Sequence, residues 1–150
     1  MIPLRLRLKN FLGYRESHEL SLEGIRLACL SGDNGAGKSS LLDAMTWVLW
    51  GRARGRDRGR TDADGLIHAG QSEMEVELEF GLGRETTEGE TTQRYRALRK
   101  HKKGNPGRPS QTILELQVAA MSESSRTWQP VASGRDAQSK IEELLRLDYD

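Results

Sequence analysis

Eight consecutive residues near the N-terminus have the types and spacing of a phosphate-binding loop. The segment Gly32-Asp33-Asn34-Gly35-Ala36-Gly37-Lys38-Ser39 fits the pattern G-x-x-x-x-G-K-[ST]. Glycines let the backbone fold tightly with its N–H groups pointing inward, which forms an anion-binding nest at the positive end of a following helix. The residues expected to bind ATP phosphates are Gly32, Asn34, Gly35, Ala36, Gly37, Lys38, Ser39 and Ser40.

Two side chains of this loop have distinct expected roles. Lys38 would reach the β- and γ-phosphates, and the Ser39 hydroxyl would complete the coordination shell of Mg²⁺. Hydrolysis also needs a carboxylate on the metal and a group that positions water. The nearest acidic candidate, the segment 144–148, has the periodicity of a helix rather than of an apolar strand ending in Asp-Glu. The sequence therefore predicts no complete catalytic set, and the lack of an Asn-Lys-x-Asp sequence disfavours a GTPase.

The loop requires a strand before it and a helix after it. The mostly apolar run 25–30 predicts a strand covered on both faces. Apolar residues around most of the circumference of 38–49 predict a largely buried helix, with Gly51 as its end. The strand, loop and helix together predict a phosphate site rather than a glycine turn that binds nothing.

The remaining elements read as an antiparallel meander. Leu4, Leu6 and Leu8 alternate with basic residues, and a short strand at 18–22 should return antiparallel after a turn at 10–14. Beyond a long loop at 52–70, glutamates alternate with apolar residues in the strand 74–82, and arginines in the partner strand 94–98 should lie across from them. A loop at 101–110, strands at 114–118 and 128–131, and a helix capped by Ser133 complete an α/β fold with a mixed sheet and few helices.

Length and composition limit the class of protein. The chain has 150 residues, 23 Lys+Arg, 22 Asp+Glu and one cysteine, which suits a single domain without a disulfide framework. It has neither an apolar run long enough to cross a membrane nor a secretory signal, so we expect a cytoplasmic protein with no membrane partner. Cys29, inside an apolar segment, is expected in the core.

Two basic clusters are candidates for DNA contact, because clustered cations bind a polyanion by releasing its counterions. A solvated loop or a hairpin edge is the alternative for each cluster. The candidate residues are Arg52, Arg54, Arg56, Arg58 and Arg60 in the first cluster, and Arg99, Lys100, Lys102 and Lys103 in the second.

A family resemblance rests on three segments around the phosphate loop. These are Leu8-Lys9-Asn10-Phe11-Leu12-Gly13-Tyr14-Arg15, the run from Ser31 to Ala44, and Trp47-Val48-Leu49-Trp50-Gly51. They resemble the N-terminal ATP-binding segment of SbcC-type proteins, which are SMC-like ATPases of DNA double-strand break repair in the ABC ATPase class. The resemblance implies a P-loop NTPase of the ABC type, with residues 1–150 as the N-terminal lobe of a split head. The coiled coil and the C-terminal lobe would lie outside this chain.

The resemblance also implies cofactors, partners and further site residues. ATP and Mg²⁺ would be the cofactors, and two heads would form a homodimer around two ATP molecules. The C-terminal lobe, DNA and an SbcD-type nuclease would be partners. Because a P-loop supplies only part of the stabilisation that hydrolysis needs, we also expect the chain alone to hydrolyse ATP very slowly. Many relatives have Arg or Lys where this chain has Leu12, so Arg15 is a possible substitute for phosphate contact, or else an ordinary surface arginine. The loop residues expected beside the adenine are Leu66, Ile67 and His68, although a lone loop histidine is more often simply exposed to solvent.

Two other interpretations remain open. The chain could act mainly as a nucleic-acid or protein binding module whose surface is the two basic clusters. Alternatively, the same P-loop could belong to a RecF-like ATPase with a compact inserted lobe or to a transporter ABC ATPase subunit.

Overall fold

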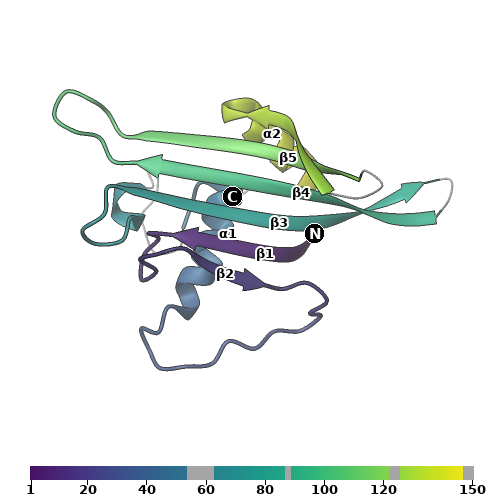
Figure 1. The fold of residues 1–150 in the computed structure, drawn as a ribbon, viewed down its shortest axis with the longest axis horizontal. Coiled ribbons are helices and arrows are strands. Elements are labelled where there is room, and N and C mark those ends of the chain that lie inside the picture. The colour runs from purple at the N-terminus through teal and green to yellow at the C-terminus, as the bar shows by residue number, and fades with distance from the viewer. Residues whose placement is uncertain (54–62, 87–88, 122–125, 147–150) are drawn as a thin grey trace.

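The structure is a single six-stranded sheet with two helices on one face (Figure 1). It is a computed structural model, in which residues 1–53, 63–86, 89–121 and 126–146 are described. The strand order is β2-β1-β3-β4-β5-β6, and every neighbouring pair is antiparallel. The strands are β1 (Ile2–Lys9), β2 (His18–Ser21), β3 (Glu73–Thr86), β4 (Gly89–Lys102), β5 (Gln111–Met121) and β6 (Arg126–Ser133).

Strict alternation of apolar and charged residues along the strands gives the sheet one apolar and one charged face. In β3, Met74, Val76, Leu78 and Phe80 are almost fully buried, as the period of two predicts. The intervening glutamates face the other way and pair with cations of the flanking strands. The ion pairs on this face include Arg5–Glu79, Arg7–Glu77 and Lys100–Glu75. The predicted balance of glutamates by basic neighbours is confirmed, and it removes the like-charge repulsion along β3.

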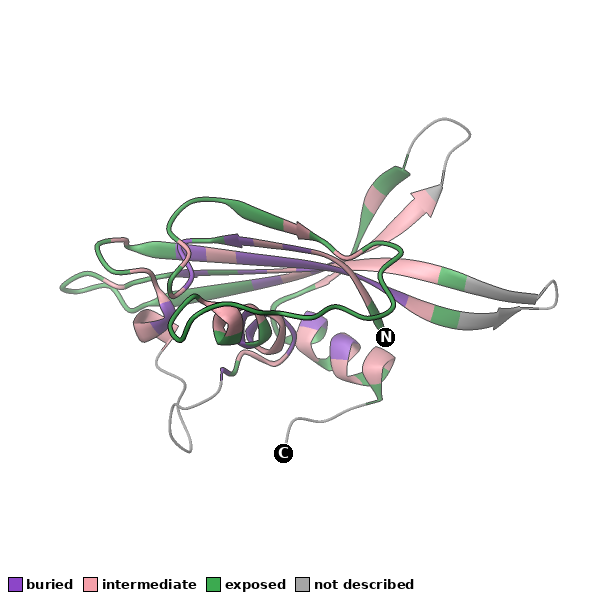
Figure 2. Ribbon diagram, turned by 90° about the horizontal axis from the view of Figure 1, so that it is seen from below, coloured by how far each residue is buried: buried purple, intermediate pink, exposed green. Residues whose placement is uncertain are grey.

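Both helices cover the apolar face, as Figure 2 shows from below. Helix α1 (Lys38–Trp50) and helix α2 (Gly134–Leu145) bury one stripe each, and the 3-10 helix η1 (Ala63–Leu66) adds Leu66. The two helices and four strands share one core, and its large side chains that are at most 1% exposed include Leu6, Trp47, Phe80, Leu116 and Ile141. Helix α1 packs against β3 and β4, and the predicted phosphate loop precedes its first residue.

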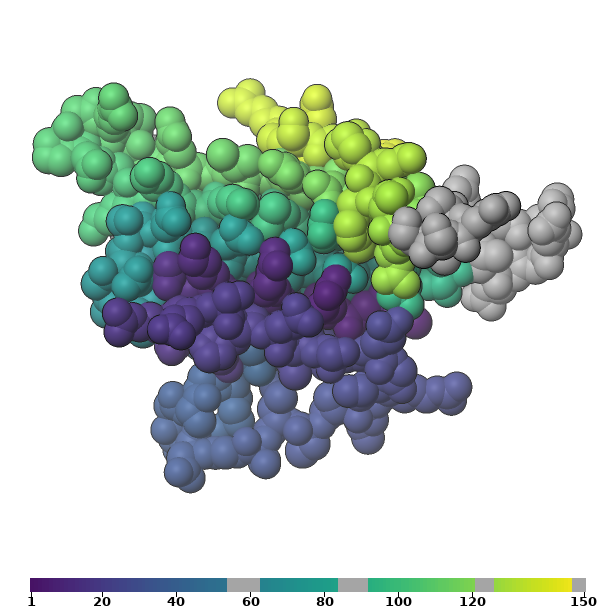
Figure 3. Space-filling model, viewed as in Figure 1, coloured from purple at the N-terminus to yellow at the C-terminus, as the bar shows by residue number. Residues whose placement is uncertain are grey.

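The predicted strand at 25–30 is wrong. This segment joins no strand, Leu27 is 91% exposed, and Cys29 is exposed rather than in the core. A strand that is apolar on both faces needs paired neighbours and two covering layers, and the described residues supply neither. The sheet is therefore antiparallel throughout the described residues rather than mixed. In Figure 3, the segment between β2 and α1 projects beyond the lower edge of the sheet.

The predicted helix at 38–49 is confirmed in extent and only partly in burial. It runs from Lys38 to Trp50, and Gly51 ends it in the left-handed conformation at φ 71°. Ala44, Trp47, Val48 and Leu49 are buried, yet Leu42 is 46% exposed. The side of α1 that carries Leu42 faces the same open region as residues 25–30. The helix predicted after Ser133 is confirmed as α2, with Ser133 at the N-cap position and no cap bond from its side chain.

Candidate nucleotide-binding site

The backbone at the start of α1 is arranged to receive an anion. Gly37 is the N-cap residue at φ 85°, no side chain caps the helix, and its first turn contains no acidic residue. Gly32 and Gly35 have φ angles of 146° and 88°, a region that side chains rarely enter. The first N–H groups of a helix have no partner within the helix and lie at its positive end. This loop therefore fits a phosphate group, which would accept those hydrogen bonds.

Lys38 folds back over the loop that precedes it. Its Nζ donates to the carbonyl oxygen of Gly32 at 2.6 Å and to that of Asp33 at 2.8 Å. An ammonium group has three N–H donors, so one donor remains for a phosphate oxygen. Lys38 thus closes the loop and keeps a positive charge beside the uncapped helix end.

Ser39 follows Lys38 in the first turn of α1 and is exposed. Its hydroxyl is the type of oxygen ligand that Mg²⁺ accepts beside phosphates. Among the described residues there is no group of three His, Cys, Asp or Glu side chains that could hold a metal ion. Ser39 is therefore the loop residue whose hydroxyl would bind a metal beside the phosphates.

The turn at 10–14 lies against the phosphate loop. The Tyr14 hydroxyl donates to the carbonyl oxygen of Gly37 at 3.3 Å, and a Cβ atom on Gly37 would lie 3.1 Å from that hydroxyl. Arg15 comes next in the chain, is exposed, and forms no hydrogen bond or ion pair with the described residues. Its proposed contact with phosphate stays a prediction.

The segment expected beside the adenine is anchored to this turn. Leu66 is 2% exposed, so its side chain belongs to the core, and Ile67 is half-buried. His68 is not simply exposed to solvent, because its Nδ1 lies 2.6 Å from the carbonyl oxygen of Leu12. Contact of Leu66, Ile67 and His68 with a base stays a prediction.

A family model described as an AAA domain (AAA_23) matches residues 5–149. The chain belongs to this family. Over its whole length it is 34% identical to the SbcC subunit of the nuclease SbcCD from Deinococcus radiodurans, of which the match covers 15%. Over 57% of the chain it is 37% identical to the DNA double-strand break repair Rad50 ATPase of Thermoplasma acidophilum, of which the match covers 9%. Relatives named DNA replication and repair protein RecF also match.

A solved structure supports the fold of this AAA lobe. The structure comes from work on ATP-driven dimerization and DNA-stimulated activation of SMC ATPases. It aligns with a TM-score of 0.58 at 21% identity, over 97% of this chain and 78% of the other. The resemblance to SbcC-type, SMC-like ATPases and the fold of a P-loop ATPase head lobe are thereby confirmed. The chain spans a small part of the relatives' length.

None of the helices in the described ranges is long and apolar enough to cross a membrane.

One predicted DNA contact of the AAA lobe is wrong. Arg99 is 8% exposed on the core side of β4, and its guanidinium donates to the carbonyl oxygens of Val48 and Leu49. Burial lowers the pKa of Arg99 to about 10. A guanidinium enclosed between a strand and a helix cannot contact a DNA backbone.

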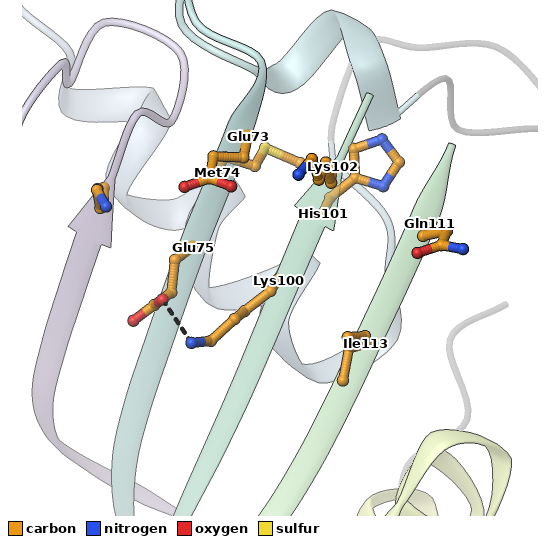
Figure 4. A pocket seen from close by; sticks show the side chains of 9 residues that line it. Glu73, Met74, Glu75, Lys100, His101, Lys102, Gln111 and Ile113 are labelled. Atoms are coloured by element: carbon orange, nitrogen blue, oxygen red, sulfur yellow. Dashed lines mark ion pairs between the residues drawn. The ribbon is translucent and has the colours of Figure 1, made fainter. Parts of the chain in front are cut away.

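The other predicted basic residues of the AAA lobe have different surroundings. Lys100 is exposed and pairs with Glu75 at 3.0 Å, as the dashed line in Figure 4 marks. Lys102 and Lys103 are exposed at the end of β4. Arg52 is exposed, and Arg54, Arg56, Arg58 and Arg60 lie outside the described residues. Figure 4 shows the hollow of about 330 Å³ that Lys100 and Lys102 line together with glutamates of β3.

Sequence reasoning missed a polar junction in the AAA lobe. His101 Nε2 lies 2.7 Å from Asp64 Oδ1, and the Ser110 hydroxyl donates to the same carboxylate at 2.9 Å. The hydrogen bond from His101 is the main cause that lowers the pKa of Asp64. These residues come from η1, β4 and the loop before β5, so only the folded chain brings them together.

Proposed function

We propose that this AAA lobe binds Mg-ATP at Gly32–Ser40 and serves an SbcC/Rad50-type ATPase in DNA double-strand break repair. The observation that carries the proposal is the uncapped start of α1, with Lys38 bonded across the loop that precedes it. Backbone N–H groups would bind and orient the phosphates, and Lys38 would add a charged donor. Mg²⁺, held in part by Ser39, would neutralise phosphate charge when bound.

ATP hydrolysis would require a C-terminal lobe and a second head. A P-loop supplies only part of the electrostatic stabilisation of phosphoryl transfer, and the described residues contain no group of three His, Cys, Asp or Glu side chains that could hold a metal ion. We expect the 150-residue chain to bind ATP and turn it over far more slowly than about one per second. A turnover near that rate without a second polypeptide would contradict the proposal.

An open apolar groove supports the proposal that a second lobe docks on this chain. It measures about 560 Å³ and runs between residues 20–30 and the exposed side of α1, with Ile25, Leu30, Leu41, Leu42 and Met45 among its lining residues. Monomers rarely expose a contiguous apolar surface of this kind without a partner. We assign this groove to the C-terminal lobe of the same protein, whose docking would give the 25–30 segment the neighbours that it lacks.

DNA would contact the lobe at the end of the β4–β5 hairpin. Cations in the middle of the charged face are neutralised by β3, as Arg7 and Lys100 show. Lys102, Lys103 and Arg108 are exposed and have no ion pair within the described ranges. Figure 1 shows this hairpin projecting past the other strands. Exposed cations outside any ion pair, on a projecting turn, suit phosphate contact.

The names of the relatives support a proposal for the assembly and the location of the protein. Because one relative is a component of the SbcCD nuclease, we propose an SbcD-type nuclease as a partner, with ATP holding two heads together as a homodimer. Matches to RecF proteins keep a RecF-like ATPase as the second candidate. For either candidate we propose a location in the cytoplasm, together with DNA. The named repair and replication relatives give a transporter ATPase no support.

Equilibrium dialysis with Mg-ATP tests the binding proposal. Lys38→Ala removes the charged donor and its two hydrogen bonds to the loop. We expect this variant to lose measurable binding of Mg-ATP. Lys140→Ala is the matched control, because Lys140 lies on α2 and pairs with Glu143 on the surface. Equal affinity of the wild type and Lys38→Ala would overturn the proposal.

A further inference from the structure

The imidazole ring of His68 forms a hydrogen bond with a backbone carbonyl that is far away in the sequence. Its Nδ1 lies 2.6 Å from the carbonyl oxygen of Leu12, 56 positions earlier. A carbonyl oxygen can only accept, so Nδ1 carries the proton and donates. Two backbone bonds flank this contact, from the His68 N–H to the Asn10 carbonyl and from the Leu12 N–H to the Leu66 carbonyl, both at 2.8 Å.

The turn held in this way is strained. Leu12 has φ 47° and Asn10 has φ 53°. Asparagine enters the left-handed region with little difficulty, whereas a leucine does so only where its surroundings enforce it. The three bonds from residues 66–68 are the enforcing contacts, and the His68 ring supplies the one that comes from a side chain.

The strained turn reaches the phosphate loop through Tyr14. Phe11 and Tyr14 exchange backbone hydrogen bonds of 2.9 and 2.8 Å, and Phe11 is fully buried against Trp47 of α1. The Tyr14 hydroxyl then donates to the carbonyl oxygen of Gly37, whose conformation opens α1 toward the phosphates. A shift of the Leu12 carbonyl would therefore be passed on to the peptide at Gly37.

We infer that His68 is a positioning residue for the nucleotide site: by donating from Nδ1 to Leu12 it fixes Tyr14 against Gly37. The inference rests on the proposed ATP binding and assigns His68 an effect on affinity without any contact with ATP.

Two variants of equal size distinguish the effect of the hydrogen-bond donor at position 68 from the effect of the rest of the imidazole ring. In His68→Asn, the side-chain amide nitrogen can take the position of Nδ1 and donate to Leu12. In His68→Asp, a side chain of the same size places a carboxylate oxygen against the carbonyl oxygen. Mg-ATP affinity should stay within about twofold of wild type for Asn and fall about tenfold for Asp, the effect of removing one hydrogen bond.

The measurement is Mg-ATP affinity by equilibrium dialysis on the full chain, with urea unfolding run on each variant to show that it is folded. His68→Asp binding as tightly as wild type, while Lys38→Ala does not bind, would overturn this inference alone. An equal loss of Mg-ATP affinity in His68→Asn and His68→Asp would also overturn it. The affinity would then depend on the whole ring and not on the donor at Nδ1. If wild type and Lys38→Ala bind alike, the proposed function fails as well.

A measurement on the unaltered chain keeps the inference testable if the Asp variant fails to fold. Nitrogen-15 spectra of the histidine rings report which ring nitrogen carries the proton. We expect the Nδ1-protonated tautomer for His68, with the proton engaged in a hydrogen bond. An Nε2-protonated ring would show that Nδ1 cannot donate to Leu12, and the inference would fall.

Discussion

Arg99 on β4 lies against the last turn of α1, with its Nε 3.1 Å from the carbonyl oxygen of Val48. Its Nη2 lies 2.7 Å from the side-chain oxygen of Gln138 on α2. One planar guanidinium therefore joins a strand to both helices, and it satisfies carbonyls at a helix end that have no partner within the helix. The positive charge also lies at the negative end of α1, where it is favourable.

Removing this side chain should destabilise the fold. We expect Arg99→Ala to lower the free energy of unfolding by about 3 kcal/mol, because buried carbonyls lose their donors and a cavity remains. Arg99→Lys should also be costly, because an ammonium cannot form the same planar set of bonds. Urea unfolding measures both. The exposed Arg135 provides the control, since Arg135→Ala should change stability by less than about 0.5 kcal/mol. An equal effect of the two alanine variants would contradict the capping role.

Asp64 should make stability depend on pH in the acid range. The bond from His101 lowers the pKa of Asp64 below its ordinary value of 3.8, so the folded state favours the charged carboxylate. The stability that it contributes is present above the pKa of the unfolded aspartate and is lost as pH falls through the lower folded pKa. Urea midpoints at a series of pH values should thus show Asp64→Asn less stable than wild type at pH 6, with the difference shrinking below about pH 4. A difference that grows toward low pH would contradict this account.

The strands were predictable because their signal is local. Alternation of apolar and charged residues in 74–82 fixes which side chains face the core whatever the rest of the chain does. The same rule, carried two and four residues past Ala97, places Arg99 and His101 on the core side with Tyr95. The wrong assignment of Arg99 to DNA came from considering a charge cluster without the alternation of the strand.

Other features depend on neighbours that local patterns do not reveal. An apolar run such as 25–30 enters a sheet only if strands are available to pair with it, so composition alone could not place it. The phosphate loop was predictable because its chemistry lies within eight residues. The bond from His68 to Leu12 spans 56 positions and required the folded topology.

Salt dependence should identify the DNA-contacting cations. Removing one phosphate interaction should reduce the slope of log affinity against log salt by about 0.9 for duplex DNA. We expect Lys102→Gln combined with Lys103→Gln to flatten the slope by about twice that amount. Lys100→Gln is the matched control on the same strand, because Glu75 already neutralises Lys100 and the slope should hardly change. Fluorescence anisotropy with a duplex oligonucleotide at several salt concentrations measures the slopes, and equal slopes for all three proteins would exclude the hairpin end.

Two exposed leucines, one in the segment 25–30 and one on α1, should govern association of the chain in solution. Leu27 is 91% exposed and Leu42 is 46% exposed, so neither adds much to the core. Replacing both with serine should leave the free energy of unfolding within about 0.5 kcal/mol of wild type while reducing concentration-dependent association. Sedimentation velocity measures the association, and the control is Leu116→Ser, a fully buried change that should instead cost several kcal/mol. If the double variant unfolds as readily as Leu116→Ser, residues 25–30 and the outer side of α1 are packed in the isolated chain, and the open groove assigned to the C-terminal lobe does not exist there.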